Sequence, residues 1–277
     1  MKKVEITKLK TPYVNVEGSY GGNQGWFKQI EPQLDVKESK SVNESKSKSK
    51  VDSRGLSARK AKTIQGFGCG LIGGSDILLH LFGMPEIIEE KSGNINKKES
   101  SAKSEGTTFS REEYENYILQ MEKKFFHILP KLGISGILLA FNLNLYFLLN
   151  RRRIKKEKGS TYRARWAVLP RNILPRIKEM LSNDIPVVIA IGPGFFRKNK
   201  VIFYNKIEEP SRVVFKPVTK TKDHYVTVTG LEEYPEQVML EISSWGKKYY
   251  VNYNEYLEYV KKNDNFYFSN ILYIKKH

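Results

Sequence analysis

The order of the predicted elements indicates an α+β fold, with a helical half followed by a mainly antiparallel sheet half. In the first half of the chain, apolar residues recur at helical spacing over 66–83 and 110–132. In the second half, residues 224–231, HYVTVTGL, alternate between apolar and polar side chains, as strands do. We therefore expect helices and sheet to form two halves of one fold.

Two helices of the first half have clear predicted starts. One is predicted to begin at Cys69, because apolar residues follow it closely and a glycine and a proline after Phe82 would end the helix. The other opens with a capping box, in which Ser110 is followed three residues later by Glu113.

Residues 134–149 are the most apolar stretch of the chain and have about the length that raises the question of a bilayer. Asn142 and Asn144 lie inside this stretch, and a proline and a glycine closely precede it. We therefore expect a helix of the protein core. Arg151–Arg153 follow it and are interpreted as a solvated helix end, with contact to a membrane surface as the less favoured alternative.

From residue 171 onward the sequence changes from helical to strand patterns. An amphipathic helix is predicted over 171–184 and a buried strand with a glycine turn over 185–194. The strands expected after them are 212–218, 224–231, 237–246, 247–253 and 266–276, with a short helix over 254–262.

The chain of 277 residues is predicted to be a single domain, 1–277, with two disordered insertions on its surface. Residues 37–54 and 90–108 are rich in serine and lysine and contain few apolar side chains. Neither segment can bury enough apolar surface to offset the entropy of ordering it. Sequence with ordered character flanks both segments, so they are placed inside one fold.

The formal net charge of +17 raises the question of an anionic partner. Much of this charge lies in 37–60 and 151–158, which read as solvated, flexible segments. No zinc finger, helix-turn-helix or RNA-binding strand pattern accompanies it, so nucleic-acid binding is disfavoured. An acidic protein partner remains an open alternative.

Cysteine content and the N-terminus limit the compartment and the cofactors. A single cysteine excludes an internal disulfide and a cysteine-based zinc site, and the four scattered histidines offer no metal-ligand spacing. Residues 191–196, IGPGFF, lack the lysine and hydroxyl of a nucleotide-binding loop. The basic N-terminus has no apolar segment behind it, so no secretory signal is expected. We expect a cytoplasmic protein without a metal or cofactor.

Cys69 is the candidate nucleophile. It lies between two glycines at the start of a predicted helix, where backbone N–H groups and the helix dipole favour a thiolate. The alternative is a small residue of the core. A thiol nucleophile needs a base, and His224 at the start of a predicted strand is the histidine best placed to be held rigidly against a helix start.

These residues and their order resemble the papain-like cysteine peptidases. That superfamily has a cysteine in a glycine-containing turn that opens the central helix, a histidine that starts a later strand, and an Asn-Ser-Trp-Gly turn after it. This chain has Cys69-Gly70, then His224 in DHYVTVTG, then Ser243-Ser244-Trp245-Gly246. The pattern is nearest to the bacterial branch that includes the bacteriocin-leader peptidases, and it covers roughly residues 60–89 and 160–275.

The resemblance implies a papain-like fold whose central helix carries Cys69 beside an antiparallel sheet. It implies that Cys69 attacks, that His224 acts as the base and that Trp245 shields the histidine from water. The position that matches the family's Asn or Asp is Ser243, whose hydroxyl can accept a hydrogen bond but cannot stabilise an imidazolium as a carboxylate does. Asn252 and Glu241 are other candidates for orienting the histidine, although neither matches the motif.

The oxyanion hole of the family uses a glutamine about six residues before the cysteine. Thr63 occupies that position here, and the candidates are Gln65 and, earlier in the chain, Gln24 in YGGNQGWF. The backbone N–H of Cys69 would supply the second donor.

The function expected from the resemblance is a papain-like thiol hydrolase, a peptidase or amidase that works through an acyl-enzyme. An acyltransferase that forms amide bonds from an acyl donor and an amine is the first alternative, since it shares the mechanism up to the acyl-enzyme. A catalytically silent binding protein is the second. The expected substrates are peptides, amides or acyl thioesters.

Overall fold

Helices gather in the first half of the chain and strands in the second. The computed structural model describes residues 4–28, 52, 56–84, 108–192, 199–210, 212–263 and 266–277. The seven α-helices of this part of the chain are α1 (Ala58–Phe67), α2 (Cys69–Phe82), α3 (Arg111–Lys124), α4 (Gly136–Leu149), α5 (Arg151–Lys158), α6 (Ile173–Ser182) and α7 (Tyr253–Asn263). A mixed α+β fold is thereby confirmed.

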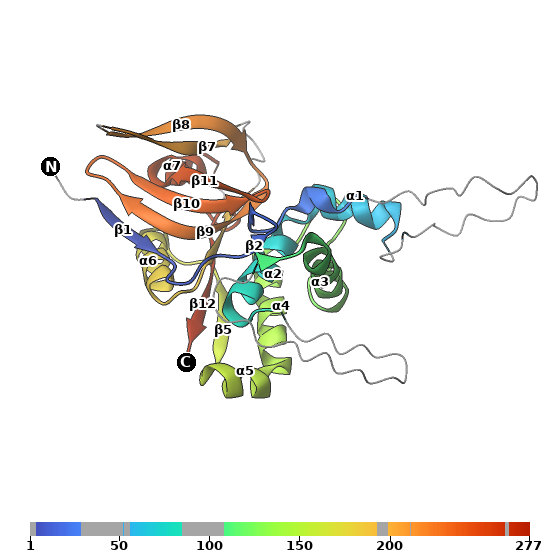
Figure 1. Ribbon diagram of the computed structural model, residues 1–277. Coiled ribbons are helices and arrows are strands. Elements are labelled where there is room, and N and C mark those ends of the chain that lie inside the picture. The colour runs from blue at the N-terminus through green and yellow to red at the C-terminus, as the bar shows by residue number, and fades with distance from the viewer. Residues whose placement is uncertain are drawn as a thin grey trace, which may run out of the picture.

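A large antiparallel sheet is the main structural element of the fold (Figure 1). Its strands run in the order β5-β12-β6-β9-β10-β11-β7-β8, and β1 pairs with β9 off this path. The strands are β1 (Glu5–Lys8), β5 (Tyr162–Trp166), β6 (Val187–Ile191), β7 (Val201–Glu209), β8 (Arg212–Thr221), β9 (His224–Glu233), β10 (Val238–Ser244), β11 (Lys247–Asn252) and β12 (Ile271–Lys276). A second, small sheet has the order β3-β2-β4 and joins β2 (Asn15–Val16), β3 (Ser19–Tyr20) and β4 (Thr108–Phe109).

The helix that begins at Cys69 is central, because α2 lies between the sheet and the other helices of the first half. It packs against β9 on one side and against α3 and α4 on another. Gly74 permits the close approach to α4, since a Cβ at this position would lie 2.9 Å from a methyl of Leu139. Eleven of its residues are buried, so the start of α2 is held firmly in the core.

Several predicted elements are observed, and some observed elements were not predicted. The hairpin of β10 and β11, the helix α7 and the start of α2 are as expected. The helix α1 and the strands β1 to β5 and β7 were missed, and the last strand begins at Ile271 rather than at 266. Residues 151–158 were expected to be flexible, but they form the helix α5, because Ile154 packs into the core. The two predicted insertions, 37–54 and 90–108, lie outside the described residues except for Asp52 and Thr108.

The most apolar stretch forms α4, which covers the edge strand β5. Asn144 is a polar residue within this apolar helix, and it has a structural role. Its side chain accepts from the Ala164 N–H (2.8 Å) and donates to the Ala164 carbonyl (2.9 Å). These bonds satisfy backbone groups that an edge strand leaves unpaired. In the part of the chain that the structure describes, no helix combines the length and the apolar character needed to cross a membrane.

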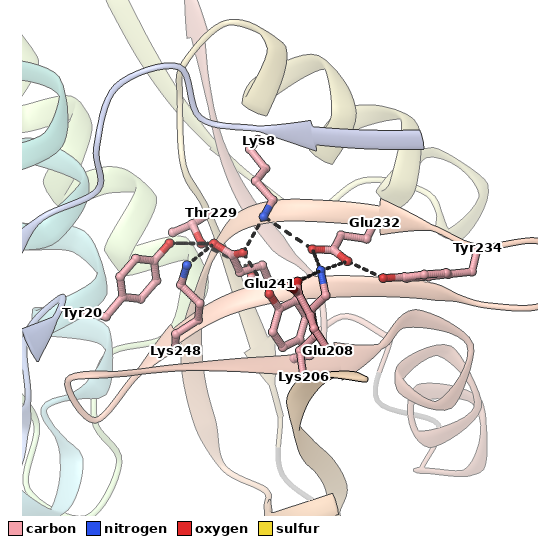
Figure 2. Close-up of polar contacts among 10 residues, drawn as sticks. Lys8, Tyr20, Lys206, Glu208, Thr229, Glu232, Tyr234, Glu241 and Lys248 are labelled. Atoms are coloured by element: carbon pink, nitrogen blue, oxygen red, sulfur yellow. Dashed lines mark hydrogen bonds and ion pairs between the residues drawn. The ribbon is translucent and has the colours of Figure 1, made fainter. Parts of the chain in front are cut away.

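A buried polar cluster ties the N-terminal segment to the sheet (Figure 2). Its centre consists of Glu232 and Glu241, whose side chains are 0% and 3% exposed. Lys8 of β1 contacts both carboxylates, at 3.0 Å from Glu241 and 3.4 Å from Glu232. Tyr20 of β3 donates its hydroxyl to Glu241 at 2.9 Å. β1 and β3 are therefore fixed to the middle of the sheet.

Both glutamates of this cluster remain ionised. Burial alone would raise the pKa of Glu232, but the Tyr234 hydroxyl and the Lys206 ammonium bring it below its ordinary value. Burial opposes ionisation of Glu241 too, and Lys248 and Lys8 lower its pKa in the same way. Each buried carboxylate thus has cationic and hydroxyl partners, as buried charge requires.

Candidate active site

The start of α2, the start of β9 and the end of β10 meet at a small recess. Its volume is about 20 Å³, enough for one water-sized group. Five of the six residues predicted for the site line it, namely Cys69, His224, Ser243, Trp245 and Gln24, and Gln65 does not. Residues far apart in the sequence are thereby brought to one place.

Cys69 is the first residue of α2. The preceding helix ends when the Gly68 N–H bonds to the Ile64 carbonyl at 2.8 Å, and α2 begins when the Ile72 N–H bonds to the Gly68 carbonyl at 2.9 Å. Burial raises the pKa of the Cys69 thiol above its ordinary value, although backbone N–H groups of Tyr225 and Gly70 act in the opposite direction. The thiol is therefore protonated at neutral pH.

His224 is the first residue of β9 and pairs with Ile191 of β6. Its side chain is buried, and this burial lowers the pKa of the imidazole to about 4. Trp245 stacks on the imidazole, with ring centroids 4.6 Å apart and planes 16° apart. The backbone of Trp245 and Gly246 has positive φ, at 51° and 72°, so a tight hairpin turn holds the indole over the histidine.

The partner of His224 differs from the predicted one. His224 Nε2 lies 2.8 Å from the Ser244 hydroxyl, whereas the Ser243 hydroxyl donates to the Tyr20 carbonyl at 2.7 Å. The prediction that Ser243 orients His224 is thereby corrected to Ser244. Adjacent residues of a strand point to opposite faces, so a displacement of one residue in the motif changes which serine meets the imidazole. Ser243 instead anchors β3 to β10.

The other two candidates for orienting the histidine have different roles. Glu241 belongs to the buried cluster beneath β1, described above. The Asn252 side chain accepts the N–H groups of Asn254 and Glu255 and so caps the start of α7. Neither contacts His224.

The two glutamines proposed for the oxyanion hole are linked to each other, and only one reaches the recess. Gln24 Nε2 donates to the Gln65 backbone carbonyl at 2.7 Å, and the Gln65 side chain donates away from the recess to the Phe27 carbonyl at 2.8 Å. An amide has two N–H donors, so Gln24 keeps one for a bound oxyanion. Gln24 is the better candidate on this geometry.

Asp76 is a residue of the recess that the sequence analysis missed. It lies seven residues after Cys69 on α2, which places both on one face of the helix. Its carboxylate accepts from the Tyr114 hydroxyl (2.6 Å), the Gly22 N–H (3.0 Å) and the Tyr13 hydroxyl (3.2 Å). Burial raises its pKa to about 6, against these hydrogen bonds.

The bond from Gly22 to Asp76 explains how Gln24 comes to the recess. The segment before η1 (Gln24–Trp26) passes so close to α3 that a Cβ at Gly22 would overlap the Tyr114 hydroxyl. Asn23 then accepts the Gly25 N–H at 2.8 Å and turns the chain into η1. The helical spacing of Asp76 from Cys69 was a signal that could have identified it.

No family model, curated protein or solved structure matches this chain. The geometry of the recess is therefore the basis of the function proposed below. Among the described residues, no cluster of three or more His, Cys, Asp or Glu side chains could hold a metal ion. His80, at the other end of α2, contacts the Asp184 carbonyl at 3.2 Å and is not part of the recess.

The low pKa of His224 predicts a loss of stability in mild acid. The unfolded chain takes up a proton near the ordinary histidine value of 6.5, whereas the folded chain does so only near 4. Stability contributed by neutral His224 is complete above about pH 6.5 and falls by about 3 kcal/mol as the pH drops toward 4. The free energy of unfolding in urea is measured at about pH 7 and pH 5 for the wild type and for His224→Gln. From the higher to the lower pH, the variant is expected to lose less stability than the wild type. An equal loss in both proteins would contradict the burial of a neutral imidazole.

Proposed function

We propose that the chain is a thiol hydrolase with a papain-like arrangement of its site, acting on amide or thioester bonds. The observation that carries the proposal is the shared recess, whose lining includes Cys69 at the start of α2 and a histidine held by Ser244 and Trp245. A half-buried thiol, a neutral base and an orienting group are the parts that thiol catalysis needs. A free catalytic thiol suits a reducing compartment, so the proposal places the enzyme in the cytoplasm.

The resting site holds a neutral pair. The raised thiol pKa and the lowered imidazole pKa both favour thiol and imidazole over thiolate and imidazolium. If Nε2–H donates to Ser244, Nδ1 is the basic atom of the ring. The proton then moves from the Cys69 sulfur to Nδ1 as the sulfur attacks the substrate carbonyl, so that His224 acts as a general base.

The remaining steps return the proton. The carbonyl oxygen becomes an oxyanion, for which the backbone N–H of Cys69 and the second N–H of Gln24 are the proposed donors. When the intermediate collapses, the bond from the carbonyl carbon to the leaving nitrogen or sulfur breaks and the imidazolium protonates the leaving group. Water then attacks the thioester carbonyl and gives one proton to His224. The bond from the carbonyl carbon to the Cys69 sulfur breaks, the acid leaves and the imidazolium returns the proton to the sulfur.

Replacement of the two neighbouring serines should separate their roles. Ser244→Ala is expected to slow acylation of Cys69 roughly 10- to 100-fold, because the imidazole loses the bond that fixes its orientation. Ser243→Ala is the matched control and should change the rate much less, since Ser243 bonds to Tyr20 instead. The measurement is the acylation rate with an activated ester, followed by intact-protein mass. A larger loss in Ser243→Ala would restore the original assignment.

The acyl acceptor is tested by trapping the acyl-enzyme. The chain is mixed with a simple acyl thioester or activated ester, and the acyl group on Cys69 is followed by intact-protein mass. A hydrolase loses the acyl group to water at a rate independent of added amine. An acyltransferase keeps the acyl group until an amine is added and then releases an amide. A catalytically silent binding protein does not become acylated at all, and that outcome would refute the proposal.

A further inference from the structure

An exposed apolar stripe runs along α4. Ile137, Phe141 and Leu148 are 52%, 61% and 65% exposed, and their spacing places them on one face of the helix. Among the described residues, half of the large apolar side chains that are exposed lie between 129 and 149. Such clustering differs from the scattered exposure that is normal on a protein surface, and it marks an interaction surface.

Cations follow the stripe directly. The helix α5 continues from the end of α4 (Figure 1) and buries only Ile154. All its exposed side chains except Glu157 are basic. These basic residues are Arg151, Arg152, Lys155, Lys156 and Lys158. An apolar stripe thus ends in a dense group of positive charge.

A cavity of about 560 Å³ opens between the end of α4, α5 and the start of β5. Leu148 of the stripe is part of its lining, together with Phe147 and Tyr162. Arg151 and Arg163 also line it and supply guanidinium groups, which bind phosphate oxygens in a forked geometry. The cavity therefore combines an apolar wall with anion-binding groups.

We propose that the α4–α5 face, defined as this stripe, the α5 cations and the cavity, docks on the surface of an anionic lipid bilayer. The stripe enters the interfacial region, and the cations and the cavity contact lipid phosphates. Apolar insertion and attraction to anionic headgroups are the two terms that set such binding.

The other possible occupants fit this face less well. In a dimer built on this face, the α5 cations of each copy would lie against like charges or against the apolar stripe of the other copy, and neither arrangement gives them an anionic partner. A partner helix needs a groove along α4, whereas the side chains of the stripe protrude from it. A bilayer surface deforms around protruding side chains and needs no matching groove.

The first test is co-sedimentation of the full chain with vesicles. Vesicles of phosphatidylcholine are compared with vesicles that contain about one third phosphatidylglycerol. We expect retention on the anionic vesicles only, and a drop of roughly tenfold or more in Phe141→Ser combined with Leu148→Ser. Val218→Ser combined with Leu169→Ser removes two exposed apolar side chains elsewhere and should leave retention unchanged.

Charge is tested with a second matched pair. Arg152→Glu with Lys156→Glu is expected to lower retention on anionic vesicles at least tenfold more than Lys216→Glu with Lys220→Glu, which makes the same charge change on β8. Equal losses in the two pairs would mean diffuse attraction of a basic protein, and the docking face would be rejected.

Insertion into the bilayer is measured with a fluorescent probe attached to an introduced cysteine. Labelling is specific because the chain has a single cysteine, which can be replaced. In a C69S background, an environment-sensitive dye is attached through F141C or, as a control, through V218C. Anionic vesicles should shift the emission of the first to the blue and leave the second unchanged. No shift at the first position would overturn the proposal. A dimer of the chain that Phe141→Ser dissociates would also overturn it. So would a chain that binds an acidic amphipathic peptide but is not retained by vesicles.

Discussion

Cys69→Ser and His224→Ala should each lower the rate of acylation by at least about a thousandfold. The first removes the sulfur that forms the thioester. The second removes the base that takes its proton, and this loss is large because burial keeps the Cys69 thiol protonated at neutral pH. The rate is followed by intact-protein mass with an activated acyl ester in excess.

Controls make this result specific. His127→Ala replaces an exposed histidine outside the recess and should retain the wild-type rate. Urea unfolding of each variant verifies that the fold persists. If His224→Ala retained the wild-type rate while Cys69→Ser did not, Cys69 would react unaided and the proposed pair would be wrong.

Asp76→Ala is expected to cause the largest loss of stability in the recess, about 4 kcal/mol at mildly acid pH. The substitution leaves the Tyr13 and Tyr114 hydroxyls and the Gly22 N–H without their acceptor. Burial raises the pKa of Asp76 to about 6, so the stabilising neutral form is lost as the pH rises through 6. Because the unfolded carboxyl ionises near 3.8, the deficit of the variant should shrink as the pH rises from about 4 to 6 and keep its lower value above that pH.

The measurement is urea unfolding of wild type, Asp76→Ala and Asp76→Asn on both sides of pH 6. Asp76→Asn keeps an acceptor and the side-chain volume, so its deficit should be the smaller one. Asp76→Ala should also slow acylation, because the Gly22 bond positions the segment that carries Gln24. A deficit below about 1 kcal/mol would show that the carboxylate is not the anchor of this segment.

Local patterns carried most of the successful predictions. The start of α2 at Cys69 follows from a glycine turn before a dense apolar run, and the β10–β11 hairpin follows from strand alternation on both sides of Trp245-Gly246. The grouping of Cys69, His224 and Trp245 into one site was predicted from the resemblance of their order to that of the papain-like peptidases, and all three line one recess. Asn144 was expected to mark a helix of the protein core, and it bonds to β5.

The rest depended on contacts between distant segments, which a single sequence does not display. Ser243 and Ser244 are adjacent, and the choice between them rests on which face of β10 each occupies. Tyr13, Gly22 and Tyr114 meet Asp76 only after the N-terminal segment and α3 pack on α2. The pKa shifts have the same origin, because burial of His224 and Cys69 is a property of the assembled core.

The pH dependence of Cys69 acylation tests the neutral Cys69–His224 pair most directly. The rate with an activated acyl ester is measured from mild acid to mild alkali in the wild type and in His224→Ala. Because the imidazole pKa is about 4 and the thiol pKa is above its ordinary value, the rate should be level across neutral pH and fall only in acid. His224→Ala should lose this plateau. A wild-type rate that rises about tenfold per pH unit through neutrality, unchanged by His224→Ala, would contradict the proposed mechanism.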